Sequence, residues 1–244
     1  MRDDDEWSGL LDRARAGGPP GEGVLSERYG PFLRASSRPV VLAHLAQSLD
    51  GRIALPCGTS RWISGEADLV HTHRLRALAD AVVVGAHTVE RDDPQLTTRL
   101  VEGPSPLRVV LDPRRRLPAT HRVFDTTAAP TLLVGGVDLP APSGVESLAL
   151  PLRDGLLDPV GIVDALARRG VRRVLVEGGG ITVSRFLAAG CVDRLHLVVA
   201  PVLLGVGRAA LEVPLAAALE DCPRPPTRVE RLGDDWLFDC ELRG

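Results

Sequence analysis

Short apolar runs recur along the chain, separated by amphipathic segments or by turns rich in glycine and proline. Runs rich in valine and leucine are typical of strands buried on both faces of a sheet. They predict strands at 40–45, 81–85, 107–111, 131–134, 174–176 and 193–200, and a closing antiparallel pair at 229–231 and 236–242. Helices are expected between them, most clearly at 159–169, with Asp158 as its cap and Gly170 as its stop. The alternation predicts an α/β fold with a mixed central sheet.

The pattern also divides the chain into two parts. Residues 1–38 are polar and rich in glycine, proline and arginine, and we expect an N-terminal extension that packs loosely or lies across the surface, with one short helix near 7–16. Residues 39–244 form the predicted domain. Within it, a helix capped by Ser64 or Gly65 should run to about Ala79, and residues 203–211 should form a flexible loop.

Composition narrows the classes of function. The chain has 244 residues, a net charge of −3 and 29 basic side chains, all of them arginine. The absence of lysine excludes Schiff-base chemistry, and the acidic balance argues against a general nucleic-acid binder. The four scattered cysteines predict buried free thiols, with no metal site and no disulfide framework. No apolar run is long enough for a membrane span, and we expect a cytoplasmic protein.

A glycine turn directly after the strand at 174–176 is the first candidate site. Glu177 closes the strand, and Gly178, Gly179 and Gly180 lead into a predicted helix. Backbone N–H groups at such a helix N-terminus can bind a phosphate, most naturally that of a nucleotide. The glycines lack the spaced fingerprint of dinucleotide-binding turns, so the alternative is a simple connection between strand and helix.

Other polar positions also admit two interpretations. Asp50-Gly51 predicts a hairpin turn, although Ser48 and Asp50 could instead contact a ligand at a strand end. Trp62 is either a core anchor or a platform for a ring. Arg76 lies four residues before Asp80, which predicts a surface ion pair.

Two further stretches follow the next strands. Thr88 and Asp92 share one face of a short helical turn that ends at Asp93-Pro94. The basic run Arg114-Arg115-Arg116 is either a solvated loop or a grip for an extra phosphate on a cofactor.

Taken together and in order, these motifs resemble the reductase domain of the bifunctional riboflavin-biosynthesis deaminase/reductase, the RibD C-terminal family. The resemblance covers residues 39–242. It rests on these segments: Ser48-Leu49-Asp50-Gly51-Arg52, Ser60-Arg61-Trp62-Ile63, Leu75-Arg76, Thr88-Val89 with 92–97, Val176-Glu177-Gly178-Gly179, and Val192-Asp193 with Ala200-Pro201 and 203–205. It implies a dihydrofolate-reductase-like fold of three layers around a mostly parallel sheet.

The resemblance also implies roles for individual residues, with NADPH as the cofactor. The expected cofactor-binding residues are Ala46, Trp62, Thr88, Asp92, Gly178, Gly179, Gly180, Ile181 and Thr182, within a phosphate-binding stretch at 179–185. The expected substrate-binding residues are Ser60, Arg76, Leu96 (through its backbone), Arg99 and Glu177. His44, Asp50 and Glu177 are the expected catalytic residues. Our own addition is that Arg114 and Arg115 hold the cofactor's 2′-phosphate.

The implied reaction reduces the ribosylamino group of a pyrimidine 5′-phosphate to ribitylamino. The sugar opens to an imine, hydride reaches its C1′ and a proton must reach nitrogen. Many family members carry a lysine four residues before the serine of the Ser-Leu-Asp-Gly motif, where this chain has His44. His44 is either the proton donor or a core histidine. His71, His73 and His87 are expected to be surface or packing residues.

Three further expectations concern partners and alternatives. The zinc signature of the deaminase half is missing, so deamination would need another protein. The family implies a homodimer. An alternative substrate is dihydrofolate, another pterin or a compound of a flavin-like pathway, and a non-enzymatic alternative is a nucleotide sensor or scaffold.

Overall fold

The computed structural model describes residues 2–58, 63–137, 139–214 and 217–243. The helices are α1 (Arg2–Ala16), α2 (Val24–Leu33), α3 (Glu66–Leu78), α4 (Ala86–Asp92), α5 (Pro159–Arg168) and α6 (Gly180–Ala188), with 3-10 turns η1 (Arg122–Phe124) and η2 (Leu219–Asp221). The strands are β1 (Val40–Ser48), β2 (Arg52–Ala54), β3 (Ala81–Gly85), β4 (Leu107–Leu111), β5 (Thr131–Gly135), β6 (Glu146–Ala149), β7 (Leu152–Arg153), β8 (Leu156–Leu157), β9 (Arg173–Glu177), β10 (Arg194–Ala200), β11 (Arg208–Ala209), β12 (Thr227–Leu232) and β13 (Asp235–Glu241).

The central sheet of the described residues has nine strands in the order β12-β13-β10-β1-β9-β3-β4-β5-β6. Its strands from β10 to β6 are parallel, and β13 and β12 join one edge as the predicted antiparallel pair. The chain moves from β1 outward to β6, returns to place β9 between β1 and β3, and continues to β10 beyond β1. The predicted α/β class with a mixed, mostly parallel sheet is therefore confirmed.

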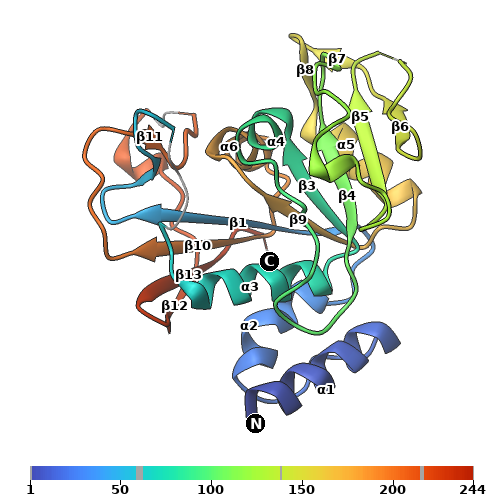
Figure 1. Cartoon of the computed structure of the whole chain (residues 1–244). Helices are drawn as coiled ribbons and strands as arrows, with labels where there is room; N and C mark the ends of the chain where they lie inside the picture. The colour runs from blue at the N-terminus through green and yellow to red at the C-terminus, as the bar shows by residue number, and fades with distance from the viewer. Residues whose placement is uncertain (1, 59–62, 138, 215–216, 244) are drawn as a thin grey trace.

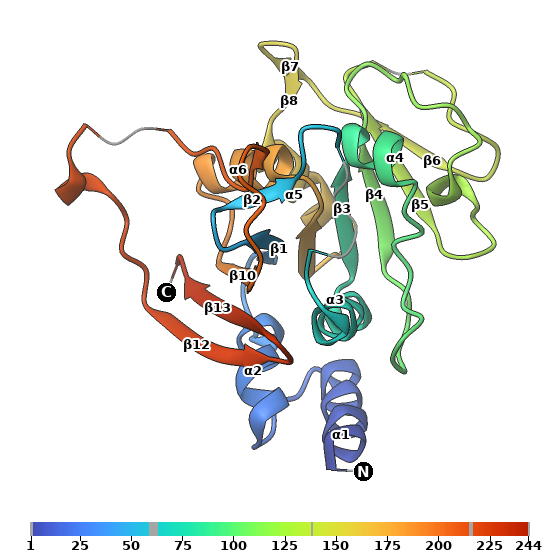
Figure 2. The same ribbon diagram turned by 60° about the vertical axis from the view of Figure 1, so that its left-hand side comes forward.

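Helices cover both faces of this sheet (Figures 1 and 2). Side chains alternate between the faces, as strand geometry requires. Leu42 and Leu175 pack in a core with α1, α2 and α3, whereas Val41 and Val174 pack in a second core with α5 and α6. The residues at 174–176 are fully buried, as predicted for a strand covered on both faces.

Local signals explain the best-predicted helices. Asp158 accepts a hydrogen bond from the Val160 N–H, Pro159 occupies the first turn, and Gly170 follows the end of α5 at a φ of 83°. Helix α3 begins after Gly65 and ends at Leu78, with Ala79 in an extended conformation. Both helices agree with the prediction to within one or two residues.

Of the two alternatives for the N-terminal extension, loose packing is wrong, because the extension is folded onto the domain. It forms the helical hairpin α1–α2, seen beneath α3 in Figure 1. Trp7, Leu10, Tyr29 and Phe32 are buried in the same core as α3, and Trp7 Nε1 donates a hydrogen bond to the Glu102 carbonyl at 3.0 Å. The stretch is polar overall, but its apolar side chains recur at helical spacing and form a face that can be buried, and this pattern decides how it packs.

Two loop predictions need correction. Asp50-Gly51 forms a turn, with Gly51 at a φ of 72°, but β2 pairs with β11 and not with β1, so the turn does not make a simple hairpin. The loop predicted at 203–211 contains β11 itself. Among the described residues, no helix is long and apolar enough to cross a membrane.

Candidate functional site

Two adjoining cavities lie at the carboxyl ends of β1, β9 and β3. The connections of the sheet diverge here, and parallel α/β sheets bind ligands at such a switch point. The first cavity has a volume of about 260 Å³ and the second of about 660 Å³. Both are lined by His87, Thr88, Gly179 and Arg208, so they are two parts of one cleft.

The glycine turn after β9 forms the wall between the two parts. Gly178 has a φ of 122°, which strongly favours glycine, and a Cβ at Gly180 would lie 2.1 Å from the Ala210 carbonyl oxygen. The Gly179 N–H donates a hydrogen bond to Thr88 Oγ1 at 3.0 Å, which fixes the turn against α4. Helix α6 therefore begins at the cleft with its positive dipole end.

The first cavity gathers one group of the expected cofactor residues. It is lined by Gly179, Gly180, Ile181, Thr182 and Arg114. Arg116 and Arg185 add positive charge to it. Arg115 does not line it: the Arg115 guanidinium contacts the Ser147 hydroxyl instead. Of the two arginines expected to hold the 2′-phosphate, Arg114 therefore lies at the cavity and Arg115 does not, and Arg116 lines the cavity with Arg114.

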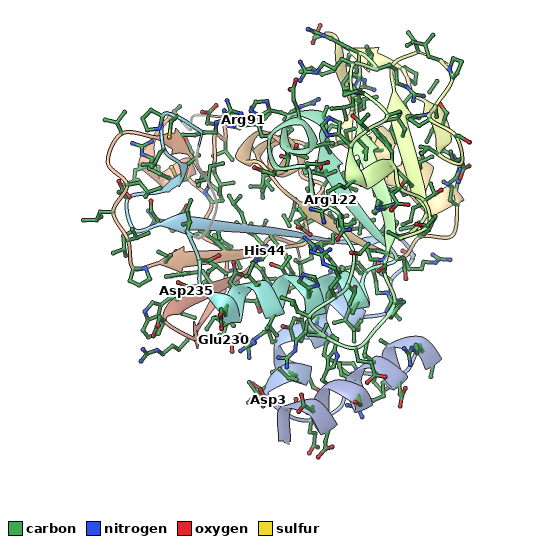
Figure 3. The ribbon with its side chains drawn as sticks, in the orientation of Figure 1. Asp3, His44, Arg91, Arg122, Glu230 and Asp235 are labelled. Atoms are coloured by element: carbon green, nitrogen blue, oxygen red, sulfur yellow. The ribbon has the colours of Figure 1, made fainter. Side chains whose placement is uncertain are left out.

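The second cavity combines expected cofactor and substrate residues. Ala46, Thr88, Asp92, Gly178, Arg99 and Glu177 line it. It also holds residues that the sequence did not single out as ligands: Ser64, Arg91, Arg122 and Arg208. No motif marks these arginines, because only the fold brings them to one place. Figure 3 shows Arg91 near α4 and Arg122 close to β4.

Arg99 lies close to other positively charged side chains. Burial, and then the positive charges of Arg76 and Arg122, lower the pKa of Arg99. Its backbone N–H donates to His73 Nδ1 at 2.8 Å, and its guanidinium donates to Thr97 Oγ1 at 2.6 Å. Burial and the neighbouring arginines lower the pKa of His73 to about 4, so the ring is neutral and can accept this bond. His73 is therefore a buried residue that positions Arg99.

Arg76 pairs with Glu177 and not with Asp80. The Arg76 Nε donates to Glu177 Oε2 at 2.8 Å, its Nη2 contacts Oε1, and its Nη1 donates to the Thr97 carbonyl at 3.2 Å. Burial alone would raise the pKa of Glu177, but Arg76 more than offsets it and the pKa is lowered. Asp80 pairs with Arg173 instead. The predicted ion pair between Arg76 and Asp80 is therefore wrong.

His44 is a buried residue of β1, and its side chain lies between β1 and α3 (Figure 3). It is the register partner of Glu177, and its Nε2 is 2.9 Å from Asp68 Oδ1. Burial lowers the pKa of His44, but the Asp68 carboxylate outweighs burial, so the pKa is raised. Ser64 donates to the other Asp68 oxygen at 2.6 Å, and this hydroxyl group borders the cavity. A hydrogen-bonded chain thus links the His44 imidazole to the cleft.

A second buried histidine network lies behind His44. Tyr29 Oη is 2.8 Å from His71 Nδ1, and His71 Nε2 is 3.1 Å from His196 Nδ1. Burial and neighbouring positive charge lower the pKa of His71 well below its usual value, so this ring is neutral. His71 is a packing residue, as one of its two interpretations predicted.

Several expected site residues lie elsewhere or are not described. Asp50, Leu96, His44 and Arg76 are not among the described residues that line either cavity. Leu96 is buried, with a φ of 54°. Ser60 and Trp62 fall outside the described residues. Among the described residues, no group of three or more His, Cys, Asp or Glu side chains could hold a metal ion.

An α/β protein with a glycine turn at the switch point of its sheet belongs to a broad class of nucleotide-binding folds. Comparison with known proteins narrows this class. The model of the RibD C-terminal domain matches residues 39–236. The chain therefore belongs to the RibD C-terminal domain family, and the resemblance drawn from its motifs is confirmed.

Individual relatives agree with this assignment. The chain is 36% identical over 220 residues to the 2,5-diamino-6-ribosylamino-4(3H)-pyrimidinone 5′-phosphate reductase of Methanothermobacter thermautotrophicus, covering 85% of this chain and 100% of that protein. It is 36% identical over 241 residues to the riboflavin biosynthesis protein RibD of Mycobacterium tuberculosis, covering 97% of this chain and 62% of that protein. The chain spans 60% of the RibD of Aquifex aeolicus and 50% of that of Bacillus amyloliquefaciens.

Solved structures show the same fold. The deaminase/5-amino-6-(5-phosphoribosylamino)uracil reductase of Thermotoga maritima superposes with a TM-score of 0.76 at 30% identity, covering 89% of this chain and 61% of that one. The riboflavin biosynthesis reductase Rib7 of Saccharomyces superposes with a TM-score of 0.70 at 22% identity, covering 85% of this chain and 91% of that one. The latter likeness concerns the fold alone.

Proposed function

We propose that the chain is an NADPH-dependent reductase that converts the ribosylamino side chain of a ribosylaminopyrimidine 5′-phosphate to ribitylamino. The names of the relatives support the reaction class and the substrate class. The observation that carries the proposal is the joined cleft. Glu177 and Arg99 share the larger part with Thr88 and Gly179, which also border the smaller part.

The residues of the smaller part fit a phosphorylated dinucleotide. The glycines at 178–180 let the turn pack closely against Thr88 and the Ala210 carbonyl, and helix α6 directs its N-terminus at the cleft. Arg114 and Arg116 border the same cavity, and paired guanidinium groups suit the 2′-phosphate that distinguishes NADPH from NADH. When bound, the cofactor supplies the hydride.

The residues of the larger part fit the substrate. Arg91, Arg99 and Arg122 bring positive charge to the cavity, which suits a phosphomonoester dianion. Glu177 is held in one orientation by Arg76, so its carboxylate can align sugar hydroxyl groups against the cofactor side of the cleft. Orientation of the sugar is the main contribution that these residues make.

Reduction of the opened sugar consumes one proton at nitrogen, and we propose His44 as its source. Asp68 favours the protonated imidazole, and the hydrogen-bonded chain through Ser64 reaches the cavity. In this step Ser64 gives its hydroxyl proton to the substrate nitrogen, Asp68 returns a proton to Ser64, and His44 gives its Nε2 proton to Asp68, so that His44 ends neutral and must take up a proton before the next turnover. Asp50, in contrast, is placed on a neighbouring loop.

The proposal includes two further expectations. We propose that the protein works in the cytoplasm, as the sequence leads us to expect, and as a homodimer, as the resemblance implies. Light scattering of the purified chain tests the second, and twice the chain mass of 26.0 kDa is the expected result.

Oxidation of NADPH in the presence of candidate substrates tests the function. We expect turnover with the ribosylaminopyrimidine 5′-phosphate in its aminated form, its deaminated form or both, and none with dihydrofolate. Turnover with dihydrofolate alone would support the pterin alternative, in which three arginines around the substrate would have no purpose. Tight NADPH binding without turnover of any of these compounds would support a sensor.

A further inference from the structure

A segment at 201–212, which we call the strap, crosses the N-terminus of α6. The Ala210 N–H donates to the Gly51 carbonyl at 3.0 Å, and the Glu212 N–H donates to Ser184 Oγ at 2.8 Å. The Ala210 carbonyl sits so close to Gly180 that no side chain would fit between them. The strap is therefore packed directly against the helix end that borders both cavities.

Asp50 fastens the beginning of the strap. Its carboxylate accepts hydrogen bonds from the backbone N–H groups of Leu204 at 3.1 Å and Gly205 at 2.6 Å, and from the Ser48 hydroxyl at 2.6 Å. The Ser48 bond and these backbone donors lower the pKa of Asp50 to about 2, so the carboxylate stays charged at neutral pH. The Ser48–Asp50 motif therefore has a structural role that does not involve the substrate.

The strap carries Arg208 to the junction of the two cavities. Arg208 lies on β11, opposite Ala54 of β2, and lines both parts of the cleft. Its Nη1 donates to His87 Nε2 at 2.9 Å. Burial and the charges of Arg208 and Arg91 lower the pKa of His87, so the neutral ring accepts this bond. A guanidinium has five N–H donors, and His87 uses one.

We propose that Arg208 binds the pyrophosphate bridge of the dinucleotide, with His87 as the residue that positions it. This inference rests on the proposed function. If the adenosine half lies in the first cavity beside Arg114 and the nicotinamide half lies in the second, the bridge must cross the junction that Arg208 borders. The α6 N-terminus then supplies N–H groups from one wall and Arg208 supplies them from the strap.

The test compares direct binding of NADPH and of NADH by calorimetry in the absence of substrate. Arg208→Gln should raise the Kd of both cofactors by the same factor, about tenfold or more, since each contains the bridge. Arg208→Lys keeps the charge and should recover most of the affinity. Arg114→Gln should weaken NADPH alone. Arg231→Gln on β12, which removes an equal charge from an exposed position, is the matched control.

Three results would overturn the assignment. Unchanged Kd values for Arg208→Gln would show that the guanidinium serves only the contact with His87. A loss confined to NADPH would place Arg208 at the 2′-phosphate. If Arg208→Lys does not restore the cofactor affinity and the Tm is also lowered, the loss of affinity comes from a disturbed strap and not from a lost contact with the cofactor. If the unaltered protein binds neither cofactor, the proposed function fails as well, and this result is separate from the other three.

Discussion

His44 and Asp68 form a buried pair that Ser64 connects to the candidate substrate cavity, with His44 Nε2 2.9 Å from Asp68 Oδ1. The two side chains come from β1 and α3, so only the fold brings them together. Burial would favour a neutral imidazole, and the carboxylate reverses that preference. The position at which the family resemblance leads us to expect a lysine therefore still holds a basic group whose protonated form is favoured.

This pair predicts the pH dependence of activity. The pKa of His44 is raised above its ordinary value of 6.5, so the imidazolium persists to higher pH than in a free histidine, and turnover should fall as the pH rises through the raised pKa. Asp68→Asn removes the carboxylate, burial then dominates, and the falling limb should move to lower pH by about one unit or more. Profiles of kcat/KM against pH measure the shift.

Ser64→Ala is the matched control, because it removes a hydrogen bond to Asp68 and keeps the charge pair. It should move the limb much less. The stability supplied by the raised pKa of His44 is fully present below the unfolded value of 6.5 and is lost as the pH rises through the folded value. If the falling limb of kcat/KM lies at the same pH in Asp68→Asn and in the unaltered protein, this result contradicts the role of His44.

The Arg76–Glu177 pair predicts a large effect on stability. Arg76→Ala leaves the Glu177 carboxylate buried without its partner, which costs about 3–5 kcal/mol in pairs of this kind. Glu177→Gln on the Arg76→Ala background removes the stranded charge and should recover most of the loss. Urea unfolding measures both, and a double variant that is less stable than Arg76→Ala would contradict this account.

The same pair also predicts a kinetic effect. In variants that remain folded, Glu177→Gln and Arg76→Ala should each reduce turnover of the phosphorylated substrate far more than they weaken NADPH binding. Kinetic constants and the Kd for NADPH measure the two effects separately. Unchanged substrate kinetics in both variants would remove Glu177 and Arg76 from the substrate site.

The position of Arg122 in the second cavity predicts that its guanidinium binds the substrate phosphate. Its backbone N–H donates to Asp93 Oδ1 at 2.8 Å, which holds η1 against the end of α4. Arg122→Gln should raise KM for the phosphorylated substrate about tenfold, since a charge-assisted contact is lost, and should leave a dephosphorylated analogue unaffected. Arg153→Gln, at an exposed position on β7, is the control. Equal effects on both substrates would argue against a phosphate contact.

The buried hydrogen bond of Tyr29 allows a prediction of how the N-terminal hairpin contributes to the free energy of unfolding. Tyr29→Phe leaves His71 Nδ1 without its buried partner and should lower the free energy of unfolding by about 1–3 kcal/mol. Ser26→Ala on the same helix is the control, because the Ser26 hydroxyl is buried with no hydrogen-bond partner among the described residues. Thermal unfolding of the two variants makes the comparison. Equal Tm values would show that the hairpin does not depend on this contact.

Strands and capped helices could be predicted from the sequence because their signals are local. The valine-rich strand at 174–176 and helix α5 with its Asp158 cap needed only neighbouring residues. The hairpin α1–α2 was missed in part because Pro31 and several glycines mask the apolar stripe that buries Tyr29 and Phe32. Short strands such as β7 and β8 carry too few residues for a periodic pattern.

The site was predicted where a motif marks it and missed where only tertiary structure creates it. The glycine turn and Thr88 could be found from spacing. The partner of Arg76 could not, because the i,i+4 prediction assumed a helix through Asp80, and α3 ends at Leu78. Arg91, Arg122 and Arg208 come from α4, η1 and β11, and no feature of their local sequence links them.

The account depends on the nicotinamide facing the first carbon of the sugar inside a single cleft. Reaction with NADPH deuterated at C4 of the nicotinamide, on the face that is transferred, tests this contact directly. We predict one deuterium at C1′ of the ribityl chain, located by NMR of the product. A product without deuterium at C1′, formed at a rate that still depends on NADPH, would contradict direct transfer across the cleft.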